Sequence, residues 1–343
     1  MALKRVTIQN IADACGLSRN TVSKVFNGRG SVPEATRQSV LQKAQELGYF
    51  QLSDKPSDAP VVPQNGNIAL LTHSKPLNHS FGSHFVTAFT DQICRAGYNL
   101  KMYEISDPEL EARTLPPHLL LKDTAGILGI ELFDKGYLEM LCAVGLPIIL
   151  VDCNAGAGYS ILHGDLILMD NFASSISLTR HMLVMGAKTI GFVGDIRHCT
   201  SFEERWLGYR TAMQEAGLEP DAACSILAKD SKMYGNPDWY RMHLDRMPRI
   251  PDAFVCANDY IAIHLMTALK KKGLSIPNDV MIAGFDGSPE SDIVEPALTT
   301  AQIPSTEMGR ITADILLNRI QNPERPFLRT YVCTIPVFRG STR

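Results

Sequence analysis

Residues 7–26 read TIQNIADACGLSRNTVSKVF, and this stretch predicts two short helices joined by a tight turn. Thr7 is placed to cap a helix over about 8–15, because its hydroxyl can accept a backbone N–H that the first turn leaves without a partner. Gly16 ends that helix and permits the turn, after which a second helix follows over about 19–26. In both helices apolar residues recur three and four positions apart, which gives each helix one buried stripe.

The rest of the first fifty residues fits the same small helical unit. Pro33 stands where a first-turn proline is tolerated and Gly48 is a stop signal, so a third helix is expected between them. A helix, a short glycine-containing turn and a second helix form the helix–turn–helix motif, whose second helix can enter the major groove of DNA. Residues 1–50 are therefore expected to form a small all-α headpiece.

The charge is distributed unevenly along the chain. Residues 1–50 contain seven Lys or Arg and three Asp or Glu, a net charge of +4. Since the whole chain carries −3, the remainder carries −7. A basic segment of residues 1–50 attached to an acidic remainder favours a polyanionic partner for residues 1–50. A block of charged residues can also serve only to keep a surface solvated.

The second helix leaves a polar face once its buried stripe is subtracted. Arg19 and Asn20 stand at its amino-terminal end, and Lys24 lies one turn after Asn20 on the same face. Arg and Lys suit guanine and Asn suits adenine in the major groove, so these three are the candidate base-reading residues. The short donors suited to phosphates are Thr7, Thr21, Ser23 and Asn27. Each residue taken singly is equally well explained as part of a solvated helix face.

The headpiece resembles a known family. The segment TIQNIADACGLSRNTVSKVFNGRGSVPEATRQSVLQKAQELGY is similar to the headpiece of the LacI/GalR family of transcription regulators, over roughly residues 6–49. The resemblance places Arg19, Asn20 and Lys24 on base-reading positions. It places five further residues on phosphate-contacting or supporting positions, namely Thr7, Thr21, Ser23, Asn27 and Thr36.

Residues 51–66, QLSDKPSDAPVVPQNG, are expected to be a linker that departs from the family. Pro56, Pro60 and Pro63 oppose a stable helix. The family commonly carries a hinge of the pattern Y-x-P-N-x-x-A-R-x-L, whose leucine wedges into the minor groove. This chain has Asp58-Ala59-Pro60 where that leucine would be sought, so we expect no intercalating hinge helix.

From residue 67 the chain alternates between apolar runs and helical stretches, which predicts an α/β fold of two doubly wound parallel-sheet lobes. The apolar runs expected as buried strands are 68–71, 125–130, 147–151, 189–193, 253–256 and 280–285. The expected helices are 82–96, 136–144, 171–185, 203–216, 259–272 and 306–320. The first lobe is expected to end near residue 152, a fresh series to start near 165, and 323–338 to cross back. Residues 67–343 would thus form one effector-binding and dimerisation domain.

Ligands of open α/β sheets bind beyond the carboxyl ends of strands, and polar residues follow several predicted strands. These are Thr72-His73-Ser74, Asp152, Asn258-Asp259 and Asp286, with Arg205 on a helix facing the same crevice. Aromatic side chains that could stack on a ring are Phe81, Trp206 and Trp239. Such a set suits adjacent sugar hydroxyls or another small polar metabolite. An Asp after a strand is also a common helix cap, which is the alternative for Asp259 in particular.

The resemblance extends into this part of the chain. The segments DNFAS at 170–174, ERWLGY at 204–209, CANDYIA at 256–262, GFDG at 284–287, PALTT at 296–300 and PVFRGST at 336–342 are similar to the family's periplasmic-binding-protein-like core. The resemblance places Asp152, Arg205, Asn258 and Asp286 on effector-contacting positions. His73, Phe81 and Trp239 complete the candidate effector set, from less well-matched segments.

Other function classes are disfavoured. The eight cysteines form no CxxC pair and no metal-ligand spacing, no run reaches the roughly 18 apolar residues of a membrane span, and the amino terminus lacks a signal-peptide core. The common catalytic motifs are absent. We therefore expect a cytoplasmic protein that is not an enzyme, with no catalytic residues, no metal and no cofactor.

These observations lead to one prediction of function and one alternative. The chain is expected to be a sequence-specific transcription regulator, a repressor, that binds a double-stranded DNA operator as a homodimer and responds to a sugar-like effector bound between its lobes. The dimer surface is expected around Phe85, Phe89 and Ile93, with core burial as an equal alternative for that stripe. The alternative function is a transport-type sugar-binding protein, which the missing export signal and the helix–turn–helix oppose.

Overall fold

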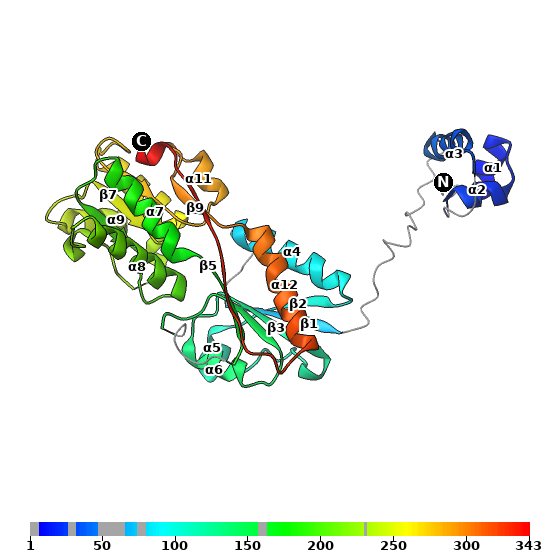
Figure 1. Ribbon diagram of the computed structural model, residues 1–343, viewed down its shortest axis with the longest axis horizontal. Helices are drawn as coiled ribbons and strands as arrows, with labels where there is room; N and C mark the ends of the chain where they lie inside the picture. The colour runs from blue at the N-terminus through cyan, green and yellow to red at the C-terminus, as the bar shows by residue number, and fades with distance from the viewer. Residues whose placement is uncertain (1–6, 27–31, 47–65, 74–79, 157–162, 230–231) are drawn as a thin grey trace. The chain divides into compact units, whose positions relative to one another are not determined.

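The computed structural model separates into two compact units, residues 1–62 and 63–343 (Figure 1). It describes residues 7–26, 32–46, 66–73, 80–156, 163–229 and 232–343. Apart from Gly66, the expected linker 51–66 lies outside the described residues.

The smaller unit is a bundle of three helices, as predicted. They are α1 (Ile8–Cys15), α2 (Arg19–Phe26) and α3 (Glu34–Glu46). Thr7 caps α1 reciprocally with Asn10: the Asn10 backbone N–H donates to the Thr7 hydroxyl, and the Thr7 N–H donates to the Asn10 side chain. Gly16 follows with a φ of 64°, a left-handed conformation that suits glycine. The fully buried side chains include Ile11, Ala12, Val22 and Val40.

The first lobe of the larger unit is built on a six-stranded parallel sheet in the order β10-β5-β4-β3-β1-β2. Its strands are β1 (Asn67–Thr72), β2 (Asn99–Glu104), β3 (Thr124–Ile130), β4 (Ile148–Val151), β5 (Asp165–Met169) and β10 (Arg329–Val332). Its helices are α4 (Ser80–Arg95), α5 (Asp107–Ala112), α6 (Lys135–Cys142) and α12 (Ser305–Gln321), with a 3₁₀ turn at Leu121–Asp123.

Helices cover both faces of this sheet. Successive side chains of a strand point to opposite faces, and in the central strands the side chains on both faces are apolar and need cover. From β1, Ile68 and Leu70 join the core that contains Phe85 of α4, whereas Ala69 and Leu71 join the core beneath α6. The central strands β1, β3 and β4 are therefore buried on both sides, as their continuous apolar runs predicted.

The second lobe contains a three-stranded parallel sheet, β6-β7-β8, and an antiparallel pair, β9 and β11. The strands are β6 (Ile190–Val193), β7 (Ala253–Cys256), β8 (Met281–Ala283), β9 (Thr300–Gln302) and β11 (Ile335–Val337). The helices are α7 (Asn171–Val184), α8 (Thr200–Glu215), α9 (Pro237–Arg246), α10 (Asp259–Lys271) and α11 (Pro289–Ile293), with 3₁₀ turns at Ala222–Cys224, Lys232–Gly235 and Gly340–Thr342.

The chain passes between the lobes three times: after β5, between β9 and α12, and between β10 and β11 (Figure 1). The first crossing comes later than expected. Residues 165–169 were expected to open the second lobe, but β5 pairs with β4 and completes the first sheet. The expected crossing by residues 323–338 is confirmed, since β10 pairs with β5 and β11 with β9.

Phe85, Phe89 and Ile93 are fully buried in the core of their own lobe. The rings of Phe85 and Phe89 stack with centroids 6.3 Å apart. The core explanation for this stripe is therefore correct, and it is not available as a dimer surface.

A buried ion pair fixes the turn that leads into β10. The Arg319 Nε and a terminal nitrogen each donate to Asp165 over 2.9 Å, and both side chains are almost fully buried. Arg319 also donates to the carbonyls of Pro323 (3.0 Å) and Pro326 (2.8 Å), while the Leu328 backbone N–H donates to Asp165 over 2.7 Å. One guanidinium thus joins α12, the start of β5 and the turn before β10.

Replacing Arg319 by Met should strongly destabilise the larger unit, because it leaves the Asp165 carboxylate buried without its partner. We expect a loss of about 3–5 kcal/mol in the free energy of unfolding, measured by urea titration of the full chain. Arg180→Met on α7 is the control, since Arg180 pairs with Glu215 at an exposed site and its replacement should cost about 1 kcal/mol or less. Equal losses in the two variants would contradict the role given to Arg319.

Candidate functional site

The outward face of α2 carries the three candidate base-reading residues. Arg19, Asn20 and Lys24 are all exposed. Their orientation is fixed from the opposite side of the helix, where Val22 and Val25 are buried against α1 and α3.

The candidate phosphate-contacting residues lie around the ends of these helices. Thr7 is exposed at the start of α1, and Thr21, Ser23 and Thr36 are half-buried. The Ser18 hydroxyl caps α2 by accepting the Thr21 backbone N–H over 3.1 Å. Asn27 lies outside the described residues.

In the larger unit, Asp152 links the two lobes. It follows β4 in a left-handed conformation with a φ of 62° and is buried. Its Oδ1 accepts the backbone N–H of Cys153 over 2.7 Å and that of Ser201, in the first turn of α8, over 3.3 Å. A carboxylate of the first lobe therefore faces the amino-terminal end of a second-lobe helix.

Arg205 of α8 is the buried cation of this site and is only 3% exposed. Its Nε donates to the Asn171 side chain over 2.9 Å, and one terminal nitrogen donates to the Ala257 carbonyl over 2.6 Å. The same nitrogen lies 3.4 Å from Asp286, and the guanidinium lies 3.6 Å from the centre of the Phe285 ring. The structure thus brings Arg205 and Asp286 together, as the sequence predicted.

Asn258 and Asp259 have different roles. The Asn258 side chain caps α10 by accepting the Ile261 backbone N–H over 2.9 Å. Asp259, which was considered as a cap, instead accepts the Thr300 hydroxyl over 2.7 Å and the Ser288 backbone N–H over 2.8 Å. The helix-cap alternative therefore applies to Asn258 rather than to Asp259.

The two neighbouring carboxyl groups of the second lobe are hard to ionise. Burial, together with the charge of Asp286, raises the pKa of Asp259 to about 7. Burial also raises the pKa of Asp286 to about 6; Arg205 opposes this rise and Glu131 adds to it. Removal of water and repulsion between like charges both favour the neutral acid.

Three other candidates have different surroundings. His73 is exposed after β1, and its Nε2 lies 2.8 Å from Asp107. Trp239 packs in an aromatic cluster with Tyr234 and His243, at ring-centroid distances of 5.0 and 4.3 Å. Phe81 lies in the first turn of α4, and its side chain is outside the described residues. Their assignment to the effector site stays a prediction.

Sequence reasoning missed three polar residues of the site. Glu131 directly follows β3 and has a φ of 55°. Glu204 accepts the Tyr331 hydroxyl over 2.7 Å and the Asn171 side-chain amide over 2.9 Å. The signals were present: Glu131 follows the apolar run 125–130, and Asn171 and Glu204 belong to the segments DNFAS and ERWLGY.

The described ranges contain no group of three His, Cys, Asp or Glu side chains that could hold a metal ion. Within the same ranges, no helix is long and apolar enough to cross a membrane.

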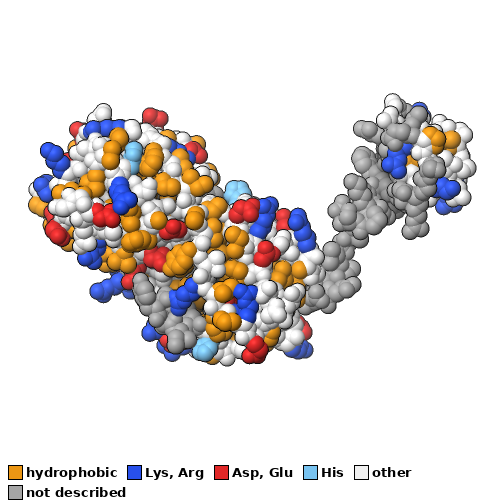
Figure 2. Space-filling view, in the orientation of Figure 1, with side chains coloured by type: hydrophobic (Ala, Val, Ile, Leu, Met, Phe, Trp, Pro, Cys, Tyr) orange, Lys and Arg blue, Asp and Glu red, His pale blue; other side chains and the backbone are white. Residues whose placement is uncertain are grey.

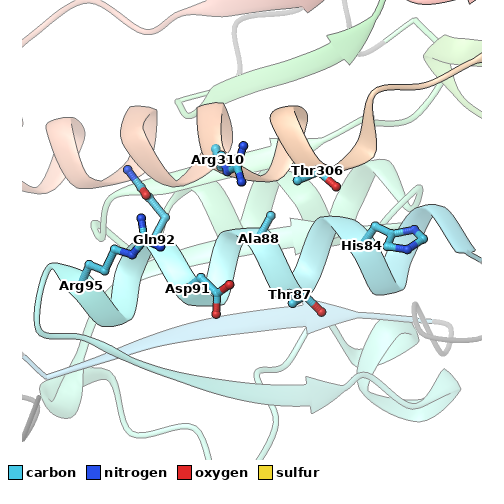
Figure 3. A pocket seen from close by; sticks show the side chains of 8 residues that line it. All are labelled: His84, Thr87, Ala88, Asp91, Gln92, Arg95, Thr306 and Arg310. Atoms are coloured by element: carbon cyan, nitrogen blue, oxygen red, sulfur yellow. The ribbon is translucent and has the colours of Figure 1, made fainter. Parts of the chain in front are cut away.

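A separate surface groove runs between α4 and α12 and is lined by His84, Thr87, Ala88, Asp91, Gln92, Arg95, Thr306 and Arg310 (Figure 3). Figure 2 shows acidic and basic side chains next to one another over these two helices. The groove is distinct from the Asp152–Arg205 site, which lies at the carboxyl ends of the strands.

Two family models match the chain. Residues 7–51 match the model described as bacterial regulatory proteins, lacI family, and residues 179–342 match the periplasmic binding protein-like domain. The first match covers the helical unit and the second covers most of the second lobe with the Arg205–Asp286 pair.

Whole-length relatives and solved structures agree with these matches. The chain is 28% identical to the HTH-type transcriptional repressor PurR of Actinobacillus pleuropneumoniae serotype 3 (strain JL03), over 92% of this chain and 91% of that protein. It is 26% identical to the regulator CelR of Thermobifida fusca, over 96% and 97%. The CelR–cellobiose complex matches with a TM-score of 0.72 at 25% identity, over 98% of this chain and 100% of that one. A lac repressor dimer bound to operator and an anti-inducer matches in fold with a TM-score of 0.68 at 22% identity, over 99% of each chain.

The raised pKa of Asp259 predicts a pH-dependent effect of Asp259→Asn. The folded chain holds a proton that the unfolded chain releases between about pH 4 and pH 7, so this group lowers stability as pH rises through that range. Asn is neutral throughout. Its amide oxygen can accept the Ser288 backbone N–H, and its amide nitrogen can donate to the Thr300 hydroxyl in place of the bond that Asp259 accepts from it. The variant should gain on the order of 2 kcal/mol over the native chain at pH 8 and much less at pH 5, measured by thermal unfolding.

Asp252→Asn is the matched control. Burial would raise the pKa of Asp252, but hydrogen bonds from Lys188 and Thr189 outweigh it and hold that pKa below its usual value. This variant should therefore lose stability by a similar amount at both pH values. A pH-independent effect of Asp259→Asn would contradict the raised pKa.

Proposed function

Because the chain belongs to the LacI family of bacterial regulatory proteins and is a DNA-binding transcription regulator, we propose that it is a repressor whose operator affinity is set by a sugar-like effector. Residues 1–50 would be the headpiece, 51–66 the linker and 67–343 the effector-binding and dimerising part. The observation that carries the proposal is the pairing, in one chain, of an exposed Arg19-Asn20-Lys24 face with the polar site around Arg205. Its place of action would be the cytoplasm, at the chromosomal DNA.

The headpiece would read operator DNA with α2. Arg19 and Lys24 suit guanine and Asn20 suits adenine in the major groove. Thr7, Thr21, Ser23, Asn27 and Thr36 would contact or support the phosphates, which set register but not sequence. The transport-type alternative gives no use to this exposed face and is not favoured.

The effector would bind between Asp152 of the first lobe, which contacts the start of α8 at Ser201, and the Arg205–Asp286 pair of the second lobe. Carboxylates, an amide and a guanidinium suit pairs of sugar hydroxyls, and the related CelR has been solved with cellobiose. A ligand that contacts both lobes binds more tightly to one relative orientation of them and so shifts the population of that orientation. A coupling of about 1–3 kcal/mol would change operator affinity by about 5–150-fold.

We propose a homodimer as the binding form, since a twofold protein matches a near-palindromic operator. The exposed face of α4 and α12 supports this, because Asp91, Arg95 and Arg310 all line the groove between these two helices (Figure 3). A surface with both signs of charge can be complementary to a second copy of itself.

Arg19→Ala should relax base preference at one position of each half-site, with a loss of about 1–3 kcal/mol of discrimination there. Thr21→Ala should weaken binding to all sequences alike, since its role is positional. Both variants can be compared with the native chain on an operator selected from random-sequence DNA and on its single-base variants. Uniform weakening by both variants would overturn the assignment of Arg19 as a base-reading residue.

Two measurements on the full chain test the proposal as a whole. Operator affinity should fall steeply with salt, with a logarithmic slope of about −0.9 for each phosphate contact. A panel of sugars should contain a member that raises the unfolding temperature, because a true ligand stabilises the native state by mass action, and this member should also change operator affinity. DNA binding that is weak and insensitive to salt would overturn the regulatory function.

A further inference from the structure

A tyrosine of the segment that joins the lobes is hydrogen-bonded across them. Tyr331 lies on β10, the edge strand of the first sheet, and its hydroxyl donates to Glu204 of α8 in the second lobe over 2.7 Å. Hydrogen bonds to an ionised acceptor are stronger than those between neutral groups. Because Tyr331 is 52% exposed, replacing it by phenylalanine removes the hydroxyl without opening the core.

Glu204 uses its two carboxylate oxygens for two different partners. One oxygen accepts the Tyr331 hydroxyl, and the other accepts the Asn171 side-chain amide over 2.9 Å. Burial raises the pKa of this carboxyl group, and the bonds from Tyr331 and Asn171 oppose the rise, so both bonds favour the ionised form. Glutamine offers one acceptor and one donor where the carboxylate offers two acceptors. It would therefore lose one of these two bonds.

Asn171 passes this constraint on to the buried cation of the effector site. The side chain is fully buried, and its oxygen accepts the Arg205 Nε over 2.9 Å. Its nitrogen donates to Glu204 and, over 3.2 Å, to the Ser201 hydroxyl. A guanidinium only donates and a carboxylate only accepts, so one orientation of the amide satisfies both neighbours. The opposite orientation would set two donors together at Arg205 and two acceptors together at Glu204.

This path lies beside two of the three crossings. Asn171 directly follows the first crossing, and Tyr331 comes one residue before the third. The two crossings are also bonded to each other. The Asp170 backbone N–H donates to the Val332 carbonyl over 2.8 Å, and the Thr334 hydroxyl donates to the Asp170 carbonyl over 3.2 Å. A change in the relative orientation of the lobes has to be absorbed in these segments, next to the residues that hold Glu204.

We propose that Tyr331 is a positioning residue of the effector site, which acts from the first lobe through Glu204 and Asn171 on the Arg205 guanidinium. The inference rests on the proposed effector site and adds a residue outside it that controls one of its groups. Because Tyr331 and Glu204 stand on different lobes, their bond belongs to the lobe orientation of this structure and weakens when that orientation changes. The effector therefore binds more tightly to the orientation that keeps the bond, and by reciprocity the bound effector stabilises that orientation.

The first test needs no ligand and follows the exchange of arginine Nε–H protons with water by nuclear magnetic resonance, on the full chain at pH 7. Arg205 and Arg319 are both almost fully buried, and their Nε–H groups donate to Asn171 and Asp165. Arg205→Lys and Arg319→Lys identify the two signals by their disappearance. Tyr331→Phe should speed the exchange at Arg205 by about fivefold, as expected for the loss of one hydrogen bond, and leave Arg319 unchanged.

Tyr137→Phe is the matched control variant. It also removes a tyrosine hydroxyl, but this hydroxyl donates to the Thr114 carbonyl within the first lobe. The exchange at Arg205 should therefore be the same in this variant as in the native chain.

Glu204→Gln tests the path itself. It should speed the exchange at Arg205 as Tyr331→Phe does, and the double variant should add little to the larger single effect, because both changes break the same bond. Unchanged exchange at Arg205 in Tyr331→Phe, or an equal change at Arg319, would overturn the proposal.

The second test connects the path with binding. The probes are glucose, galactose, mannose and cellobiose, each titrated by calorimetry into the native chain, Tyr331→Phe and Tyr137→Phe. A sugar that binds the native chain should bind Tyr331→Phe at least about fivefold more weakly, the lower end of ordinary coupling between sites. The same sugar should bind the Tyr137→Phe control with native affinity.

The outcomes separate this inference from the proposed function. If one of the four sugars changes operator affinity and binds the native chain and Tyr331→Phe equally, the proposed function stands and the role of Tyr331 is wrong. If none of the four sugars binds, the sugar assignment fails, and the role of Tyr331 in effector binding fails with it. If a sugar binds Tyr331→Phe more weakly but operator binding is absent, the positioning role stands and the regulatory function fails.

Discussion

The burial of one guanidinium organises the second lobe. Arg205 is almost fully removed from water, and an unpaired buried charge would cost several kcal/mol. Its partners come from three separate places: the start of α7 at Asn171, the end of β7 at Ala257 and the segment after β8 at Asp286. These segments must be correctly placed before the cation is satisfied, so the site and the lobe around it are formed by the same set of contacts.

A hydrogen-bonded chain extends from this cation to the strands that join the lobes. Tyr331 of β10, in the first sheet, donates to Glu204, which accepts from Asn171, which in turn accepts from Arg205. A ligand that disturbs Arg205 therefore acts on a network that ends in a crossing segment. Coupling between two distant sites needs a structural element whose position both sites can change. This network connects the Arg205 site with such an element, the strand β10 and the crossing that follows it.

The sequence predicted those features that depend on residues close together in the chain. The bounds of α1 and α2 follow from caps and apolar spacing within eight residues, and Asp152 and Asp286 follow from their positions after buried strands. Two kinds of feature could not be predicted. The edge strand β2 is largely exposed and contains polar residues, so it has no apolar run. The pairing of Asp286 with Arg205 and that of Glu204 with Tyr331 join residues that only the tertiary fold brings together.

The buried pair of Arg319 and Asp165 has a mechanical consequence. It anchors the turn before β10 to α12 and to the start of β5, and β10 is then held along β5 by its ladder. The segment that leads into the third crossing is therefore held in place at both its turn and its strand. All three crossings are short, since they join Met169 to Asn171, Gln302 to Ser305 and Val332 to Ile335, and they therefore limit how far the two lobes can separate.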